Sequence, residues 1–318
     1  MKKRYLVLPA LGAAAVGGSL VALRRAMDRW AATPDGHGGR AAVFPTPTEH
    51  VIHTDDGAAL RVVEAGQGPT VVLVHGLTSN SDDWGYVAER LVQSGRHVVG
   101  VNQRGHGGST VGTDGFGAPR LGRDLATIFE QLEIIDAVLV GHSMGGIASM
   151  SFAVDQPGLM NRRVRSLVLV STIARTSRAD QRAGLRLISA RRSDAMAEDS
   201  AAIRIIARGL FGASPSGALI EAAITSAARC PEATRIGASL GLLDYDIRDR
   251  LDTITVPTLV MCGSRDLVTP LFENNHIAAA IAGATLEIVP DAGHLVIWEA
   301  DELIAERISE RTAALVLH

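Results

Sequence analysis

The segment from Val138 to Gly146 reads Val-Leu-Val-Gly-His-Ser-Met-Gly-Gly and constrains the fold more than any other part of the chain. A β-branched apolar run ends there in Gly-x-Ser-x-Gly, and a small-residue segment with helical character follows at once. This context predicts a sharp strand-to-helix turn that holds Ser143 in strained geometry with its Oγ above a sheet. Gly141 and Gly145 leave room for the neighbouring strand and helix. We therefore predict that Ser143 is a nucleophile; an ordinary glycine-rich turn is the alternative.

Apolar runs alternate with helical patterns along much of the chain and predict the sheet around this turn. Helices are expected after Ser81 as N-cap, over residues 121–132, and from the turn to Gln156, where Pro157 stops the helix. Continuous apolar runs are typical of strands buried on both faces of a parallel sheet. The alternation predicts a mostly parallel α/β sheet with helices on both faces. The predicted strands are residues 49–53, 60–64, 70–75, 97–101, 137–140, 165–170, 258–262 and 285–289.

The alternation breaks between residues 172 and 249, which follow the sixth predicted strand and read as helical throughout. This stretch is much longer than a crossover between two strands requires. We predict a helical cap at 172–249, inserted over the carboxyl ends of the strands, between a first core part at 49–171 and a second at 250–318. Its arginines predict a solvated helix face, with a site for an anionic substrate or lipid headgroup as the alternative. These are Arg175, Arg178, Arg182, Arg186, Arg191 and Arg192.

The first thirty residues differ in composition from the rest of the chain. An almost uncharged segment of 19 residues, 5–23, has basic residues on both sides. At about 1.5 Å per residue, its helix would span roughly 29 Å, close to the thickness of a bilayer's hydrocarbon core. We predict that residues 1–30 form an uncleaved anchor and that the protein is membrane-associated through 5–23. A cleaved secretory signal on an exported protein and a buried soluble helix are the alternatives.

Residues 31–48 carry three prolines and a Gly-His-Gly-Gly patch, without a hydrophobic period. This composition predicts a linker in which His37 is solvated.

The net charge of −3 over 318 residues gives no reason to expect nucleic-acid binding. Cys230 and Cys262 lie far apart in dissimilar contexts, so a disulfide between them is not expected.

Two downstream residues complete a chemical set with Ser143. Asp266 follows the run 258–262, and His294 follows the run 285–289. Both lie just beyond the carboxyl end of a strand, where open α/β sheets build their sites. A nucleophilic serine needs a base and the base needs an orienting acid, so we predict His294 as base and Asp266 as acid. Asp291 is a rival acid, but it is three residues before His294 on one loop and poorly placed to reach Nδ1.

The remaining requirement is a pair of donors for an oxyanion. One is expected from the backbone N–H of Met144, directly after the nucleophile. The second is expected from Leu77, in the loop after the run 70–75, where Gly76 permits a close approach. His75 is expected to support this loop by hydrogen bonding rather than to act as a base.

Together the motifs resemble the α/β-hydrolase superfamily in its capped esterase, lipase and perhydrolase-like branch. The resemblance implies that superfamily's eight-stranded sheet, and the order Ser143, Asp266, His294 is its triad order. Relatives commonly have Asp where this chain has Asn102, a difference that concerns the loop. Epoxide hydrolases and haloalkane dehalogenases of similar outline use an Asp nucleophile, so Ser143 argues against both. The matching segments are residues 74–77, 102–109, 141–146, 256–270 and 292–294.

The expected function is hydrolysis of a carboxylic ester through an acyl-enzyme on Ser143, with no metal or organic cofactor. An anchor would place the cap near lipid and favours a small hydrophobic ester or a lipid ester as substrate. A thioesterase, a carbon–carbon-bond hydrolase, a cofactor-free perhydrolase or an acyltransferase would use the same triad. An alternative of another class is a non-catalytic ligand-binding protein on the hydrolase fold. The sequence makes no prediction about the oligomeric state.

Overall fold

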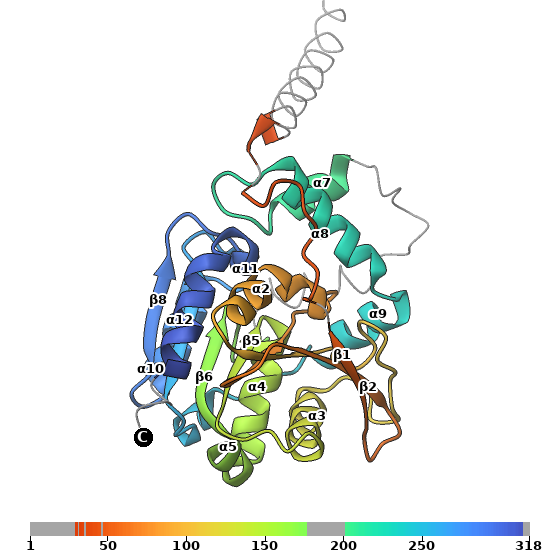
Figure 1. The fold of residues 1–318 in the computed structure, drawn as a ribbon, viewed down its shortest axis with the longest axis vertical. Helices are drawn as coiled ribbons and strands as arrows, with labels where there is room; N and C mark the ends of the chain where they lie inside the picture. The colour runs from red at the N-terminus through yellow and green to blue at the C-terminus, as the bar shows by residue number, and fades with distance from the viewer. Residues whose placement is uncertain (1–28, 31, 35, 46, 177–200, 314–318) are drawn as a thin grey trace, which may run out of the picture.

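The computed structural model describes residues 29–313 except 31, 35, 46 and 177–200. An eight-stranded sheet runs through it in the order β1-β2-β4-β3-β5-β6-β7-β8 (Figure 1). Each predicted strand is present, with ends within two residues of the prediction. The strands are β1 Thr48–His53, β2 Ala59–Ala65, β3 Thr70–Val74, β4 His97–Val101, β5 Ala137–His142, β6 Val164–Val170, β7 Thr258–Gly263 and β8 Thr285–Val289.

The parallel strands bring the loops that follow them to one edge of the sheet. β1 pairs with β2 and β2 with β4 in antiparallel fashion, whereas all pairs from β4 to β8 are parallel. The prediction of a mostly parallel α/β sheet is thereby confirmed. Because the carboxyl ends of parallel strands share an edge, the loops after β3, β5, β7 and β8 meet there.

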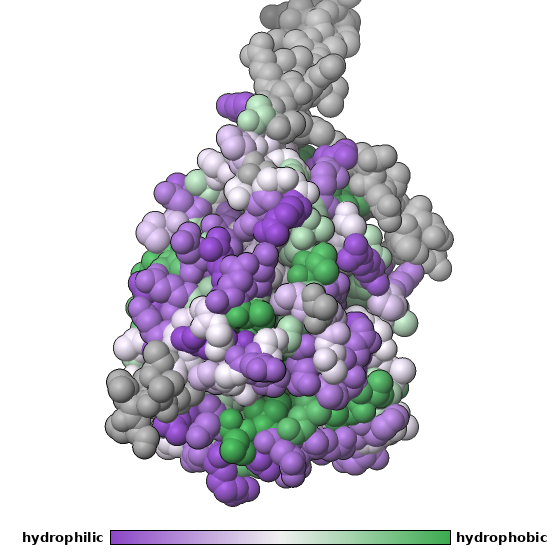
Figure 2. Space-filling model, viewed as in Figure 1, coloured by the Kyte–Doolittle hydropathy of each residue, from purple (hydrophilic) through white to green (hydrophobic). Residues whose placement is uncertain are grey.

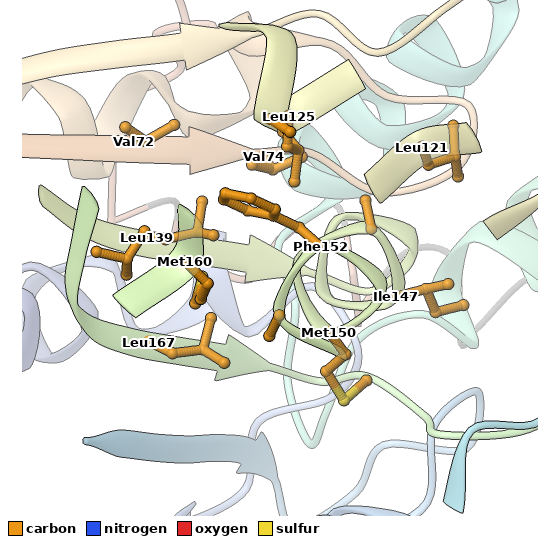
Figure 3. Close-up of a cluster of buried hydrophobic side chains, with 14 of the residues drawn as sticks. Val72, Val74, Leu121, Leu125, Leu139, Ile147, Met150, Phe152, Met160 and Leu167 are labelled. Carbon is orange, nitrogen blue, oxygen red and sulfur yellow. The ribbon is translucent and has the colours of Figure 1, made fainter. Parts of the chain in front are cut away.

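Both faces of the sheet are buried along β3 to β7, as the continuous apolar runs of these strands require. On β3, Val72 and Val74 belong to one apolar cluster, and Val71 and Leu73 to another on the opposite face. Figure 3 shows the first cluster, in which Phe152 packs against strand residues. Helices α3 (Ala118–Gln131), α4 (Met144–Asp155), α5 (Pro157–Arg163) and α10 (Leu271–Ala280) cover this face. Helices α2 (Gly85–Gln93), α11 (Val296–Glu299) and α12 (Asp301–Ala313) cover the other.

Two helix boundaries differ from their predictions. The helix expected after Ser81 begins as a 3₁₀ turn, η1 (Ser81–Trp84), and its N-cap is Asn80, whose side chain accepts from Asp82 N–H. Both residue types are good caps, and Asn80 stands one position earlier. The helix expected at 121–132 begins at Ala118, because Pro119 in its first turn has a backbone suited to a helix start.

The described part of the predicted cap contains α7 (Ala201–Arg208), α8 (Gly217–Arg229) and α9 (Glu232–Gly241), and η3 (Arg248–Thr253) returns the chain to the sheet. Figure 1 shows α7 and α8 at the end of the molecule toward which the parallel strands point. Arg175 lies 3.5 Å from the buried carboxylate of Glu273. The other arginines named for the helix face lie outside the described residues. The division into linker, core and cap stays a prediction.

Residues 36–45, predicted as part of a linker, pack against the core. Phe44 is buried, and its ring lies 2.7 Å from where a Cβ on Gly100 would stand. Tyr86 Oη donates to the carbonyl of Arg40. His37 was expected to be solvated, but its ring stacks on Tyr86 at 3.6 Å and its side chain is only 11% exposed. This packing could not be predicted from hydrophobic periodicity, because single side chains rather than a periodic apolar face attach the segment to the core.

Within the described residues, no helix combines the length and apolar character that a membrane crossing requires. The longest of the described helices, α3, has 14 residues, whereas a spanning helix needs roughly 20. We therefore correct the prediction of a membrane-associated protein. The segment 5–23, on which the anchor and the secretory alternative both rested, lies outside the described residues.

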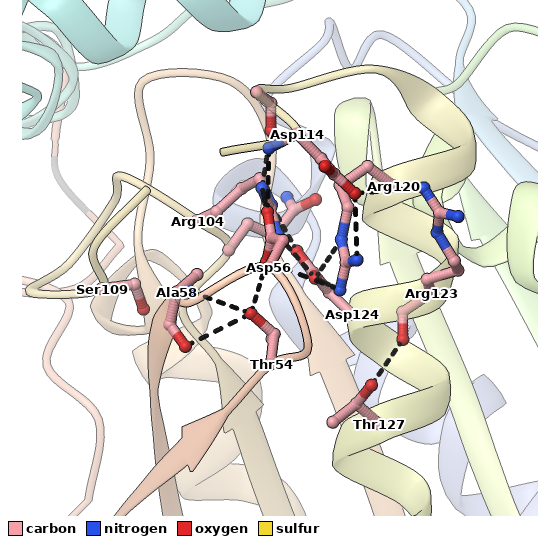
Figure 4. A network of polar contacts seen from close by, with 12 residues as sticks. Thr54, Asp56, Ala58, Arg104, Ser109, Asp114, Arg120, Arg123, Asp124 and Thr127 are labelled. Atoms are coloured by element: carbon pink, nitrogen blue, oxygen red, sulfur yellow. Dashed lines mark hydrogen bonds and ion pairs between the residues drawn. The ribbon is translucent and has the colours of Figure 1, made fainter. Parts of the chain in front are cut away.

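Buried ion pairs brace the loop that follows β4. The guanidinium groups of Arg104 and Arg120 are enclosed and both bind the carboxylate of Asp124 (Figure 4). Arg104 also binds Asp56 from the β1–β2 turn at 2.9 Å.

The molecular face seen in Figure 2 is mostly hydrophilic, with a hydrophobic strip across its lower part. Cys230 and Cys262 are both free, as expected.

Candidate active site

Ser143 stands at the junction of β5 and α4 in a strained backbone conformation, with φ 53° and ψ −116°. Non-glycine residues seldom adopt a positive φ, and such strain costs about 1–3 kcal/mol. Close packing of the neighbouring backbone maintains this conformation. A Cβ on Gly141 would lie 2.4 Å from Gly145 O, and one on Gly145 would lie 2.2 Å from Val74 O. Thr172 Oγ1 also donates to the Ser143 carbonyl at 2.7 Å. The serine is thus presented at the carboxyl edge of the sheet.

The structure brings the predicted base and acid to this serine in one chain of contacts. His294 Nε2 lies 3.1 Å from Ser143 Oγ, and His294 Nδ1 lies 3.0 Å from Asp266 Oδ2. The Nδ1–H donates to the carboxylate, which leaves Nε2 free to accept from the serine hydroxyl. Asp291, the rival acid, points away and forms an exposed ion pair with Arg265 at 2.9 Å.

Asp266 is buried but well supplied with donors. The backbone N–H groups of Val268 and Thr269 both donate to its Oδ1 at 2.8 Å. Thr269 Oγ1 donates to Oδ2 at 2.6 Å and lies 3.3 Å from His294 Nδ1. Burial would raise the pKa of Asp266, but His294 and these donors together lower it to about 2. The carboxylate is therefore ionised at neutral pH.

A second histidine contacts the backbone of the first. His142, directly before the serine, donates from Nε2 to the carbonyl of His294 at 2.9 Å. Their rings lie 5.0 Å apart. Burial lowers the pKa of His142 to about 3, so the ring is uncharged at neutral pH. His142 thus ties the loop of His294 to the turn of Ser143.

The expected oxyanion donors lie beside the serine. A Cβ on Gly76 would stand 3.2 Å from Ser143 Cβ, which places the Gly76–Leu77 loop against the nucleophile. Met144 N–H belongs to the first turn of α4, where no intrahelical acceptor exists. Within the described part of the chain, neither the Leu77 nor the Met144 N–H donates to a protein acceptor.

His75 shapes this loop, as predicted. Its Nδ1 donates to the Gly76 carbonyl at 2.7 Å, and its Nε2 accepts from Gln103 N–H at 3.0 Å. Burial holds the pKa of His75 well below its usual range, so both bonds are made by the neutral ring. With both nitrogens occupied, His75 is not available as a base.

Sequence reasoning missed Thr172, Thr269 and Glu299. A signal existed for Thr269, because an Asp followed three residues later by Thr and then Pro270 is typical of a side chain that caps a turn. Glu299 accepts from Gly293 N–H at 2.7 Å, next to His294. No signal marked Glu299 or Thr172. Thr172 contacts Ser143, 29 positions earlier, and the second partner of Glu299 is Gly212, 87 positions earlier. Among the described residues, no group of His, Cys, Asp and Glu could hold a metal ion.

The sequence of this chain is similar to that of known proteins. The model of the alpha/beta hydrolase family matches residues 71–307. Epoxide hydrolase A of Mycobacterium tuberculosis is 30% identical, over 85% of this chain and 96% of its own. Non-heme chloroperoxidase CPO-A1 of Kitasatospora aureofaciens is 27% identical, over 76% of this chain and 90% of its own.

Solved structures share the fold. An esterase from Exiguobacterium antarcticum superposes with a TM-score of 0.74 over 84% of this chain and all of its own, at 23% identity. Esterase RhEst1 from Rhodococcus sp. ECU1013 gives a TM-score of 0.73 over 84% of this chain and 99% of its own, at 20% identity. The family model covers most of the chain. The chain belongs to the alpha/beta hydrolase family.

Proposed function

We propose that this protein is a serine hydrolase that cleaves carboxylic esters through an acyl-enzyme on Ser143. One observation carries the proposal: the continuous contact from Ser143 Oγ through His294 to Asp266, at 3.1 and 3.0 Å. The N–H groups of Leu77 and Met144, which have no protein acceptor among the described residues, support it. The proposed catalytic residues are Ser143, His294 and Asp266, with Leu77 and Met144 as oxyanion donors.

In the first half-reaction, Ser143 Oγ attacks the ester carbonyl while His294 Nε2 takes the hydroxyl proton. The carbonyl π electrons move to oxygen, and the N–H groups of Leu77 and Met144 stabilise that oxyanion. Removing one such donor costs about 3–4 kcal/mol in other enzymes. Asp266, ionised because its pKa is lowered to about 2, stabilises the imidazolium that forms. Collapse of the tetrahedral intermediate breaks the C–O bond, and His294 protonates the departing alcohol.

In the second half-reaction, water attacks the acyl carbonyl and gives a proton to His294. The intermediate then releases the carboxylic acid, and the proton returns to Ser143 Oγ. The imidazole of His294 carries the proton in both half-reactions, so the proton transfers need no second acid or base.

The chemistry of serine separates this proposal from epoxide opening. Attack of Ser143 Oγ on an epoxide would leave an ether, which water does not cleave, whereas a carboxylate nucleophile would leave an ester that water can cleave. The relative named as an epoxide hydrolase therefore does not lend its reaction to this chain. The preference for a lipid ester rested on the membrane anchor and is not carried forward.

The test is hydrolysis of p-nitrophenyl esters of graded chain length by the full chain and by Ser143→Ala. We expect wild-type turnover and a loss of about 10⁴-fold or more in the variant. A fluorophosphonate should label the wild type and not the variant, which reports nucleophilicity without depending on the chosen ester. Full activity in Ser143→Ala would refute the serine mechanism. A folded wild type that neither turns over esters nor takes the label would favour a ligand-binding protein. Labelling without ester turnover would direct attention to thioesters, carbon–carbon bonds or perhydrolysis.

A further inference from the structure

The backbone on both sides of His294 is held from outside its own loop. Gly293 N–H donates to Glu299 Oε2 at 2.7 Å, and Leu295 N–H donates to the carbonyl of Leu210 at 3.0 Å. Leu210 belongs to the segment 209–213 that follows α7, within the predicted cap. The neighbours of the proposed base are thus fixed by Glu299 and by the cap.

Glu299 joins these two partners through its two carboxylate oxygens. While Oε2 accepts from Gly293 N–H, Oε1 accepts from the cap residue Gly212 N–H at 2.8 Å. A further bond joins Ala213 N–H to the carbonyl of Asp291 at 2.8 Å. One side chain therefore binds the segment 209–213 and the loop of His294 at once.

The two backbones also touch without side chains between them. A Cβ on Gly212 would lie 1.7 Å from Asp291 O, and a Cβ on Gly293 would lie 2.4 Å from the carbonyl carbon of Phe211. Such close packing transmits a displacement of one segment directly to the other. A shift of about 1 Å in a reacting group can cost about 100-fold in rate.

We propose that Glu299 is a positioning residue that couples the cap segment 209–213 to His294, so that the base is aligned with Ser143 only while this segment lies on its loop. The proposal rests on the proposed serine hydrolase function. It assigns the cap a role in assembling the triad, in addition to any role in shaping the substrate pocket.

A carboxylate is suited to this task because both of its oxygens accept hydrogen bonds. In Glu299→Gln, one oxygen still accepts, but the amide NH₂ faces the second N–H and that bond is lost. In Glu299→Ala both bonds are lost. The two variants should therefore form a graded series, with the isosteric Gln variant as the one expected to keep the fold.

The experiment compares the full-length wild type, Glu299→Gln, Glu299→Ala and a control, Thr234→Val. Thr234 Oγ1 on α9 is buried and donates to the carbonyl of Gly105 at 3.0 Å, so its loss weakens the contact of the cap with a different loop. Three quantities are measured: kcat and KM for a short p-nitrophenyl ester, the thermal midpoint, and the downfield proton resonance of His294 Nδ1–H bound to Asp266. The resonance does not depend on catalysis.

We expect kcat to fall about tenfold in Glu299→Gln and about 100-fold in Glu299→Ala, with KM changed less than about twofold. The His294 resonance should broaden or vanish in the same order. Thr234→Val should keep both kcat and the resonance even if its thermal midpoint falls as far. If the folded Glu299→Gln variant keeps the wild-type kcat and resonance, the proposal is overturned; it is likewise overturned if Thr234→Val matches its losses. If the wild type hydrolyses no ester, the proposed function fails, while the resonance still decides the coupling.

Discussion

Two acidic turns lie on opposite sides of β5 in the sheet order, one carrying Asp266 after β7 and the other carrying Asp83 in η1 after β3. Both aspartates are buried, with exposures of 4% and 8%. Their ionisation nevertheless differs in direction. The pKa of Asp266 is lowered to about 2, whereas burial raises the pKa of Asp83 to about 6.

The difference lies in the donors that each turn supplies. Asp266 accepts from two backbone N–H groups, a hydroxyl and an imidazole. Asp83 accepts from the hydroxyls of Ser79 and Ser226, the latter 2.8 Å from both of its oxygens. Neutral hydroxyls offset burial less well than an imidazole and two aligned N–H groups do. Two buried aspartates therefore differ in ionisation: one is the proposed orienting acid, and the other links α8, where Ser226 lies, to η1.

The comparison is tested most strongly by the same substitution in both turns. Asp266→Asn should lower kcat for a p-nitrophenyl ester by about 10⁴-fold, because the amide cannot hold the tautomer or stabilise the imidazolium. Asp83→Asn should lower it by less than about tenfold, because Asp83 does not contact the triad. Steady-state kinetics on both proteins at neutral pH measures the contrast. Similar losses at the two positions would erase the proposed difference in roles.

The second test is the pH dependence of stability. The folded pKa of Asp83, about 6, is above the unfolded value, so its stabilising contribution is complete below about pH 4 and is lost as the pH rises through 6. The free energy of unfolding of wild type relative to Asp83→Asn should fall by roughly 2–3 kcal/mol between pH 4 and 7.

The pKa of Asp266 is shifted in the opposite direction, so its effect on stability has the opposite pH dependence. Its folded pKa, about 2, is below the unfolded value, so its contribution is present above about pH 4 and is lost as the pH falls toward 2. Between pH 4 and 7 the stability of wild type relative to Asp266→Asn should therefore not fall. Urea unfolding of the three proteins across this range measures both differences, and parallel pH profiles would contradict the opposed shifts.

The smallest expected effect sharpens the description of the Asp266 turn. Thr269→Val removes the hydroxyl that donates to Asp266 and should lower kcat about fivefold, corresponding to one hydrogen bond of about 1 kcal/mol. Thr269→Ser keeps the donor and serves as the matched control, with kcat expected within about twofold of wild type. If Ser and Val lower kcat equally, the methyl packing of Thr269 matters rather than its hydroxyl.

The features that sequence could predict are those that a local pattern encodes. Apolar runs located β3 to β7, because a strand buried on both faces shows its burial in consecutive residues. The meeting of Ser143, Asp266 and His294 followed from one rule, that loops after parallel strands share an edge. Glu299 and Thr172 could not be found in this way, because Gly212 N–H and the Ser143 carbonyl, to which they bind, lie 87 and 29 positions away. His37 was misassigned for a similar reason, since the ring on which it stacks lies 49 positions later in the sequence.

The packing of residues 36–45 has a consequence for where the domain begins. Periodicity starts near residue 49, but a chain cut there would lack Phe44 and leave a gap beside Gly100. Gly85, too, has no Cβ because the backbone of Val43 occupies that space. Farther upstream, the Trp30 ring lies 5.9 Å from the guanidinium carbon of Arg208 on α7. Because Phe44 and the Val43 backbone fill the space beside Gly100 and Gly85, a truncation designed from hydropathy alone would remove buried contacts of the core.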